Sequence, residues 1–284
     1  MTAGSGKTIA DAVQWATQSL KGGESPAVDA RVLVCHVMDC QQSYLYTWPE
    51  KSLTDAQFSA LAELVDKRQQ GYPVAYLVGK RGFWDLELNC NPSTLIPRPE
   101  TELLVETALA LPLAETANVC DLGTGTGAIA LALASEKPGW MVTGVDRIPQ
   151  AIELAKSNAA LNGLAGLNWL ESHWFSALHP DQRFDLIITN PPYVESTSPY
   201  LHEGDVRFEP RSALTAGEDG LDDIRHIVAQ APAYLANEGW LLIEHGYTQH
   251  QAIIALLREH GFTQCRGVKD LNGQDRITMG QCTA

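Results

Sequence analysis

Long apolar stretches are absent from this sequence. Although 45% of its 284 residues are hydrophobic, no continuous run approaches the roughly 20 apolar residues that a membrane-spanning helix requires. Residues 1–21 also lack the apolar core, basic flank and small-residue cleavage site that together mark a secretory signal. We therefore expect a soluble, cytoplasmic protein, long enough for one large domain and one smaller one.

Metal-binding patterns are missing as well. None of the six cysteines forms a Cys-x-x-Cys pair, so the combination of paired cysteines with paired histidines that holds zinc is missing. We therefore expect reduced, mostly buried thiols and no metal site.

Basic residues are scarce: the chain has 20 Lys and Arg against 34 Asp and Glu, a formal net charge of −14. Residues 1–80 are nearly balanced, with 7 basic and 8 acidic residues, whereas residues 81–284 carry 13 against 26. Binding to a phosphate backbone normally depends on clustered Lys and Arg. The charge distribution weighs against a nucleic acid substrate without excluding one.

The first part of the chain has a helical pattern. Apolar residues recur at spacings of three and four over residues 9–70, with short breaks that contain glycine or proline. Thr54 is expected to cap one helix, with Gln57 completing a capping box. The pattern predicts a small helical bundle.

Residues 74–98 have a different pattern and end in a proline-rich stretch. Trp84, Leu86 and Leu88 alternate with acidic residues, which predicts a pair of strands. We divide the chain into an N-terminal helical domain, a β-hairpin linker and a main domain, covering residues 1–73, 74–98 and 99–284.

From residue 100 onward, short apolar runs alternate with amphipathic segments such as residues 151–161. This alternation predicts βαβ units, a mainly parallel sheet and hence an α/β fold. The expected strands cover residues 119–121, 141–146, 168–170 and 185–189, with two more at 240–244 and 276–279 around a helix at 249–260.

A glycine-rich loop follows the first of these strands and precedes a helix at residues 128–134. It reads Asp121, Leu122, Gly123, Thr124, Gly125, Thr126, Gly127. Glycines at a strand-to-helix turn let a ligand approach the backbone closely. The glycines follow the spacing G-x-G-x-G, which differs by one residue from the G-x-G-x-x-G fingerprint of dinucleotide-binding loops. The Asp121 carboxylate suits a ligand that carries an ammonium and a sulfonium, whereas it would repel a pyrophosphate.

Asp146 closes the next strand, 19 residues beyond Gly127. An acidic side chain at this place can accept hydrogen bonds from both hydroxyls of a ribose. The alternative is a cap for the helix that starts near Ile148, and the two roles are compatible. Asp146 is therefore a second candidate for holding a cofactor.

The tetrapeptide Asn190, Pro191, Pro192, Tyr193 follows the strand at residues 185–189, at the sheet edge where ligands bind. An amide nitrogen is a poor nucleophile because its lone pair is delocalised into the carbonyl. The Asn190 side-chain oxygen and the Pro191 carbonyl can accept its two N–H groups and aim that lone pair. The prolines stiffen this arrangement, and Tyr193 is expected to pack on the planar group. A plain proline-rich turn is the alternative.

Together these motifs resemble those of the HemK/PrmC glutamine methyltransferases, specifically the release-factor-directed enzymes. The resemblance covers nearly the whole chain and includes residues 95–102, 145–147, 174–178 and 204–210. It implies a class I S-adenosylmethionine-dependent methyltransferase fold, Rossmann-like with a seven-stranded, mostly parallel sheet. It further implies methyl transfer to the glutamine amide in the Gly-Gly-Gln loop of peptide-chain release factors, with S-adenosylhomocysteine as product.

The resemblance also implies roles for individual residues. It places Gly123 to Gly127, Asp146, Trp174 and Asn190 around the cofactor, and Asn190 to Tyr193 on the glutamine. The helical domain would grip the release factor, and we expect the enzyme to be a monomer.

Three places leave alternatives open. His173 stands where family members often have an acidic residue, so it either faces the adenine amino group or is a plain surface residue. Arg98 and residues 100–102 either shape the mouth of the cavity or form a helix N-terminus with favourable acidic charge.

The same tetrapeptide suits other planar nitrogens. One rival is an adenine-amino methyltransferase on DNA or RNA, which the acidic main domain disfavours. A closer rival is a glutamine methyltransferase that acts on a ribosomal protein. A non-catalytic protein-binding module that keeps the fold is a third.

Overall fold

The computed structural model describes residues 7–283, so residues 1–6 of the expected helical domain lie outside the described part. Contacts between residues divide the chain into two compact units. Unit 1 contains the residues up to Gly79 together with Gly204–Phe208, and unit 2 contains Lys80–Glu203 and the residues from Glu209 onward. Each unit has its own arrangement of elements.

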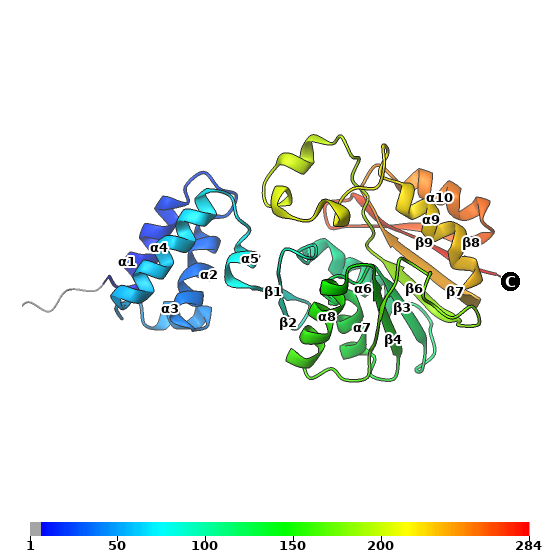
Figure 1. Cartoon of the computed structure of the whole chain (residues 1–284), viewed down its shortest axis with the longest axis horizontal. Helices are drawn as coiled ribbons and strands as arrows, with labels where there is room; N and C mark the ends of the chain where they lie inside the picture. The colour runs from blue at the N-terminus through cyan, green and yellow to red at the C-terminus, as the bar shows by residue number, and fades with distance from the viewer. Residues whose placement is uncertain (1–6, 284) are drawn as a thin grey trace, which may run out of the picture. The chain divides into compact units, whose positions relative to one another are not determined.

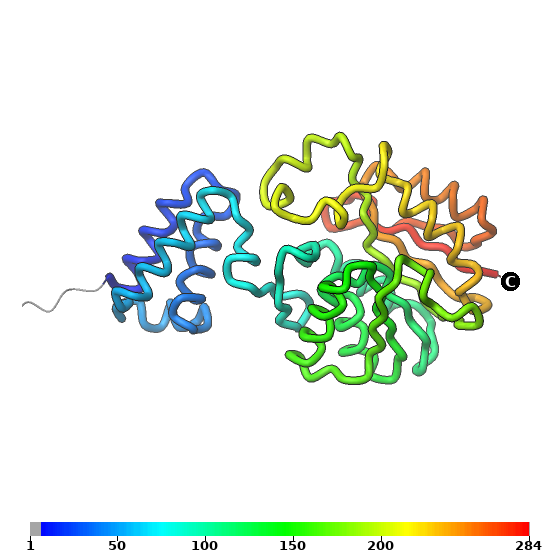
Figure 2. The backbone as a smooth tube through the Cα atoms, in the orientation of Figure 1, coloured from blue at the N-terminus to red at the C-terminus, as the bar shows by residue number. Residues whose placement is uncertain are grey.

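Unit 1 is a bundle in which the helices α1, α2 and α4 run alongside one another (Figure 2). Thr54 and Gln57 form the predicted capping box: the Thr54 hydroxyl accepts from the Gln57 amide at 3.2 Å, and Gln57 Oε1 accepts from the Thr54 amide at 2.9 Å. The core consists of buried residues such as Leu33 and Leu61. The helices are α1 (Ile9–Ser19), α2 (Pro26–Met38), α3 (Gln42–Thr47), α4 (Asp55–Gln69) and α5 (Val74–Val78).

The fifth helix was not expected, since the predicted hairpin segment began at residue 74. Residues Val74–Val78 form a short helix because Pro73, which fixes the backbone, precedes it and Gly79 ends it with a left-handed φ of 73°. The strand pair therefore starts only at Lys80.

The segment Gly204–Phe208 belongs to unit 1 although it is distant in sequence. Arg68 on α4 holds it: the Arg68 guanidinium contacts Asp29 at 2.7 Å and Asp205 at 2.6 Å. The Arg68 side chain is only 14% exposed, so this paired charge is partly shielded from water.

The hairpin of unit 2 pairs β1 (Lys80–Phe83) with β2 (Leu86–Asn89) in antiparallel register. Trp84 was expected on a strand but lies in the two-residue turn, with φ of 54°. Its amide donates to Glu102 Oε1 at 2.9 Å and its indole N–H to Glu136 at 2.7 Å. These bonds stabilise a conformation that tight hairpins require and that sequence alternation cannot reveal.

The main sheet of unit 2 has seven strands in the order β5-β4-β3-β6-β7-β9-β8. The pairs from β5 to β7 are parallel, and β9 is antiparallel to both neighbours. The chain moves outward from β3 through β4 to β5 and then returns to the other side of β3 with β6. The strands are β3 (Asn118–Leu122), β4 (Met141–Asp146), β5 (Asn168–Glu171), β6 (Phe184–Thr189), β7 (Leu235–Glu244), β8 (Phe262–Lys269) and β9 (Asp275–Cys282).

Helices cover both faces of this sheet (Figure 1). One apolar cluster joins the sheet to α6 (Glu102–Leu109), α7 (Ala128–Glu136) and α8 (Pro149–Leu161). The other joins it to α9 (Asp222–Gln230) and α10 (His250–Glu259). Short 3-10 turns, η1 to η5, lie at Pro99–Thr101, Pro199–His202, Val206–Phe208, Arg211–Ala213 and Ala231–Ala233.

The predicted α/β fold is confirmed, and each of the six predicted strands is present. The strand β8 was missed because it is an edge strand whose side chains are mostly exposed and polar, so it lacks the apolar signal. The cysteines are free thiols, of which Cys90 and Cys120 are buried and the others partly buried. Within residues 7–283, no helix is both long and apolar enough to cross a membrane.

Candidate active site

The topology of the sheet brings two loops together. Strands β3 and β6 are parallel neighbours, with Leu122 opposite Thr189, so the glycine-rich loop after β3 and the tetrapeptide after β6 begin at the same level. The connections after these strands lead to opposite sides of the sheet. In an open α/β sheet this switch point is where ligands bind.

The glycine-rich loop presents bare backbone at this point. Gly123, Gly125 and Gly127 have φ of 74°, 56° and 84°, a region that residues with side chains rarely adopt. The amides of Gly123 and Thr124 both donate to the Val145 carbonyl at 2.9 Å, which fastens the loop to β4. The turn is thus anchored to the neighbouring strand by two backbone hydrogen bonds.

Asp121 lies behind this loop and is fully buried. Its Oδ2 accepts from the Thr124 hydroxyl at 2.6 Å and from the Ala130 amide at 3.3 Å, whereas Oδ1 has no hydrogen-bond partner within residues 7–283. Burial raises the pKa of Asp121 to about 7, against the lowering effect of these two hydrogen bonds. An unpaired buried carboxylate oxygen is costly, so a cationic ligand group nearby would stabilise it.

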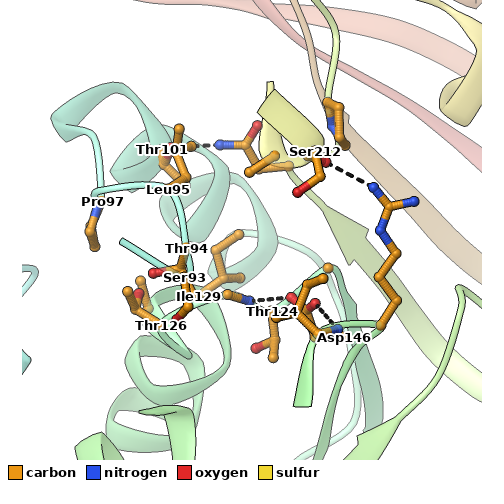
Figure 3. A pocket seen from close by; sticks show the side chains of 18 of the residues that line it. Ser93, Thr94, Leu95, Pro97, Thr101, Thr124, Thr126, Ile129, Asp146 and Ser212 are labelled. Carbon is orange, nitrogen blue, oxygen red and sulfur yellow. Dashed lines mark hydrogen bonds between the residues drawn. The ribbon is translucent and has the colours of Figure 1, made fainter. Parts of the chain in front are cut away.

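Asp146 lies at the end of β4, on the wall of a cavity. Its Oδ1 accepts from the Ile148 amide at 2.9 Å, and its Oδ2 accepts from the Gly125 amide at 2.9 Å (Figure 3). Asp146 is not the helix cap that was the alternative, since Ile148 is the N-cap of α8 and no side chain in residues 7–283 caps this helix. Burial raises the pKa of Asp146, while these amides act in the opposite direction. The carboxylate therefore braces the glycine-rich loop and remains in place to accept from a ligand hydroxyl.

Trp174 forms another wall and is only 8% exposed. It has a positive φ of 52°, and the Ser172 hydroxyl donates to its carbonyl at 2.7 Å. A Cβ atom on Gly123 would lie 3.3 Å from its ring, so the indole packs closely over the bare loop. Its indole N–H donates to Asp223 at 3.2 Å. A strained backbone held in this way is frequent at functional sites.

Asn190 projects into the cavity from the end of β6. Its amide nitrogen donates to the Thr101 hydroxyl oxygen at 3.1 Å (Figure 3). Because the nitrogen is engaged there, the side-chain oxygen is directed away from Thr101. Asn190 is therefore oriented as a hydrogen-bond acceptor for a ligand.

A buried carboxylate, not anticipated from the sequence, lies beside Asn190. Glu244 ends β7, is 3% exposed, and lies beside the side chains of Thr101 and Asn190. Its Oε2 has no hydrogen-bond partner in the described part of the chain. Burial raises the pKa of Glu244 to about 7, against the lowering effect of Thr101, Arg276 and Asn190.

The rest of the tetrapeptide is split between the cavity and the core. Pro192 lines the cavity, whereas Pro191 is buried beside it. Tyr193 does not line the cavity but packs against the apolar cluster that includes α9 and α10. Its amide donates to the Leu214 carbonyl at 3.1 Å, and its carbonyl accepts from Gln249 at 3.0 Å. A role for Tyr193 in facing the substrate stays a prediction.

The cavity encloses about 920 Å³, including its open mouth. Of the residues proposed from the sequence, those that line it are Gly123, Thr124, Gly125, Thr126, Asp146, Trp174, Asn190 and Pro192. Asp121 lies behind the loop, and Gly127 serves packing, since a Cβ there would approach Leu131, Ala155 and Trp169 to 3.2 Å.

Several cavity residues were missed. Ser93 and Thr94 come from the segment after β2, just before the motif at residues 95–102, and Ser212 belongs to η4, where its carbonyl accepts from Arg147 at 3.1 Å (Figure 3). These segments have no regular periodicity, so no pattern in the sequence could have indicated them.

The residues around the linker motif have distinct roles. Arg98 lines the cavity and is paired with Glu209, whose side chain is fully buried. Glu209 also accepts from the Ile96 amide at 3.0 Å. Glu100 is exposed, and Glu102 lies in the first turn of α6, as expected of an acidic helix start.

His173 lines the cavity although it is largely exposed, and its ring lies 5.7 Å from that of His226. No three side chains of His, Cys, Asp or Glu in residues 7–283 are grouped so that they could hold a metal ion. The bare loop, the unpaired oxygen of Asp121 and the carboxylate of Asp146 fit a ligand with cationic groups and a ribose, as S-adenosylmethionine has.

Comparisons with known proteins cover both units. Residues 11–79 match the family described as PrmC N-terminal domain, and residues 99–202 match the methyltransferase small domain. The release factor glutamine methyltransferase of Vibrio cholerae is 50% identical over 276 residues, 96% of each chain. That of Pseudomonas aeruginosa is 53% identical over 262 residues, 92% of this chain and 95% of its own. That of Escherichia coli is 43% identical over 266 residues, 94% and 96% of the two chains.

Solved structures share the fold. A ribosomal protein L11 methylase from Lactobacillus delbrueckii has a TM-score of 0.51 at 20% identity, covering 68% of this chain and 84% of its own. A 16S rRNA methyltransferase from T. thermophilus, in complex with AdoMet and guanosine, has a TM-score of 0.53 at 23% identity, covering 72% and 49%. At such identities the likeness concerns the architecture alone.

Proposed function

The chain belongs to the release factor glutamine methyltransferases, and on that premise we propose that it methylates the side-chain amide of the glutamine in the Gly-Gly-Gln loop of peptide-chain release factors. The methyl donor in this proposal is S-adenosylmethionine. The observation that carries it is the orientation of Asn190, an acceptor that points into a cavity whose opposite wall is the glycine-rich loop.

The residues of the loop would hold the cofactor. Asp121, with its unpaired Oδ1, favours the cationic amino acid end, and Asp146 accepts from ribose hydroxyls. Trp174 closes the wall over Gly123. When bound, S-adenosylmethionine supplies a methyl group on a positively charged sulfur.

The tetrapeptide would hold the glutamine. Asn190 Oδ1 accepts one N–H of the glutamine amide and the Pro191 carbonyl accepts the other, so that the nitrogen lone pair points at the methyl group. Hydrogen bonding by these two acceptors increases the electron density on nitrogen. The methylated, protonated amide is very acidic and loses its proton after the transfer, so a strong general base is unnecessary.

The helical unit would recognise the release factor. Its match to the PrmC N-terminal domain supports this role, because that domain accompanies the catalytic domain in the relatives. An enzyme with this substrate would act in the compartment of the release factors, which supports a cytoplasmic location. The nucleic acid alternative is disfavoured, since relatives that cover more than nine-tenths of the chain are named for release factors.

The test is methyl transfer with labelled S-adenosylmethionine and purified release factors, each with and without its loop glutamine replaced. We expect label only on release factors that keep the glutamine. Label that persists after the replacement would refute the assignment, and label on ribosomal protein instead would favour the closer rival.

A further inference from the structure

Glu244 is a buried carboxylate that lies beside the substrate-facing Asn190 without itself lining the cavity. Strands β6 and β7 are parallel neighbours with Thr189 opposite Ile243, so Asn190 and Glu244, the next residues, stand side by side. The 3-10 turn η1 supplies Thr101 to the same place. Three distant segments thus converge on the Asn190 amide.

Glu244 determines the direction of hydrogen bonding among Glu244, Thr101 and Asn190. An ionised carboxylate can only accept hydrogen bonds. A Thr101 hydroxyl directed at the neighbouring Glu244 must therefore donate, which leaves the Thr101 oxygen to accept from the Asn190 nitrogen, as it does at 3.1 Å. The neighbouring Asn190 amide can likewise present only its nitrogen to an ionised Glu244, because its oxygen cannot donate.

Thr101 alone could not determine which end of the Asn190 amide faces it. A hydroxyl group both donates and accepts, so it would tolerate either end of the Asn190 amide. With the oxygen directed at Thr101, the Asn190 nitrogen would face the cavity and would donate to the glutamine instead of accepting from it. Such a side chain could not hold a glutamine N–H group.

We propose that Glu244, acting directly and through Thr101, is the positioning residue that fixes the Asn190 amide with its oxygen toward the substrate glutamine. This inference rests on the proposed function of the site. Glu244 does not line the cavity, so it acts through Asn190 and not on the reacting atoms.

The protonation of Glu244 gives a distinctive signature. Burial raises its pKa to about 7, and the charged or titratable groups around it are Arg276 on β9, Glu100 on η1 and Tyr193 after Asn190. When protonated, Glu244 can donate, and the orientation of the Asn190 amide is no longer determined. The turnover number at saturating substrates should therefore fall as the pH is lowered through about 7.

The experiment compares Glu244→Gln with Glu171→Gln, an exposed carboxylate at the end of β5 in the same sheet. Because a hydrogen bond to a charged group is lost, kcat of Glu244→Gln should fall roughly 10- to 100-fold. The decline of kcat below pH 7 should disappear in this variant, while the Kd for S-adenosylmethionine stays within about twofold. Glu171→Gln should keep the turnover and pH profile of the unmodified enzyme.

Thr101 supplies a second pair of variants in case Glu244→Gln does not fold. Thr101→Val removes the hydroxyl at similar shape and should lower kcat, whereas Thr101→Ser keeps the hydroxyl and should restore it. If Glu244→Gln retains both the turnover and the pH profile of the unmodified enzyme, or if Thr101→Ser is as impaired as Thr101→Val, the proposal is wrong. An unmodified enzyme that labels no release factor would instead refute the proposed function.

Discussion

Replacing Asn190 with Ala tests the acceptor at the centre of the site. The substitution removes the side-chain oxygen proposed to hold one glutamine N–H, and it leaves the glycine-rich loop, Asp146 and Trp174 in place. Substrate turnover and cofactor binding should therefore respond differently.

The expected magnitude follows from two losses. Removing one preorganised hydrogen bond from a transition state costs about 100- to 1,000-fold in turnover. A displacement of about 1 Å of the glutamine that Asn190 no longer fixes costs about another 100-fold. We expect kcat of Asn190→Ala to fall by roughly four to five orders of magnitude. The bound cofactor loses at most one neutral hydrogen bond, so the Kd for S-adenosylmethionine should rise by no more than about fivefold.

The assay is single-turnover transfer of labelled methyl to a release factor, combined with calorimetric measurement of S-adenosylmethionine binding. The matched control is Asn168→Ala, an exposed asparagine at the opposite end of the parallel strands, which should behave like the unmodified enzyme. The substitution also removes the hydrogen bond between Asn190 and the Thr101 hydroxyl, so thermal unfolding checks that the variant is folded. Near-normal turnover of Asn190→Ala would refute the mechanism, and an equal loss of cofactor affinity would assign Asn190 to cofactor binding instead.

Three further predictions concern the loop and the helical unit. Because the pKa of Asp121 is raised to about 7, its carboxyl is protonated below that pH. The Kd for S-adenosylmethionine, measured by calorimetry, should therefore rise as the pH falls from 8 to 6. Asp121→Asn should remove this pH dependence. Gly123→Ala places a side chain at a φ of 74° and 3.3 Å from the Trp174 ring. Urea unfolding should therefore show a free energy of unfolding lower by about 1–2 kcal/mol, and an unchanged value would show that alanine fits there without strain. Thr54→Ala removes the capping box with Gln57 and should lower the free energy of unfolding by about 1 kcal/mol, whereas Thr54→Ser should not.

Much of the fold follows from local sequence patterns. Apolar runs identify the buried strands β3, β4 and β6, because parallel strands covered on both faces contain few polar residues. The glycine-rich loop and the tetrapeptide were placed correctly at the sheet edge, since each directly follows such a run. Exposed or short elements lack this signal, as β8, the helix α5 and the turn at Trp84 show.

The support around the site could not be predicted in the same way. Asn190 and Thr101 are 89 residues apart in sequence, and Arg68 and Asp205 are 137 apart. Glu244 lay within a predicted strand, but periodicity shows only that it ends an apolar run. Which carboxylate meets which amide depends on strand order, and the order becomes known only when the sheet is assembled.

Tandem mass spectrometry of a release factor after reaction with the enzyme and S-adenosylmethionine tests the methylation of a single glutamine nitrogen most directly. The fragment spectra should locate one added methyl group on the side chain of the glutamine in the Gly-Gly-Gln loop, and Asn190→Ala should leave that peptide unmodified under the same conditions. A methyl group on any other residue, or its absence from a release factor that keeps the glutamine, would contradict the assignment of this site.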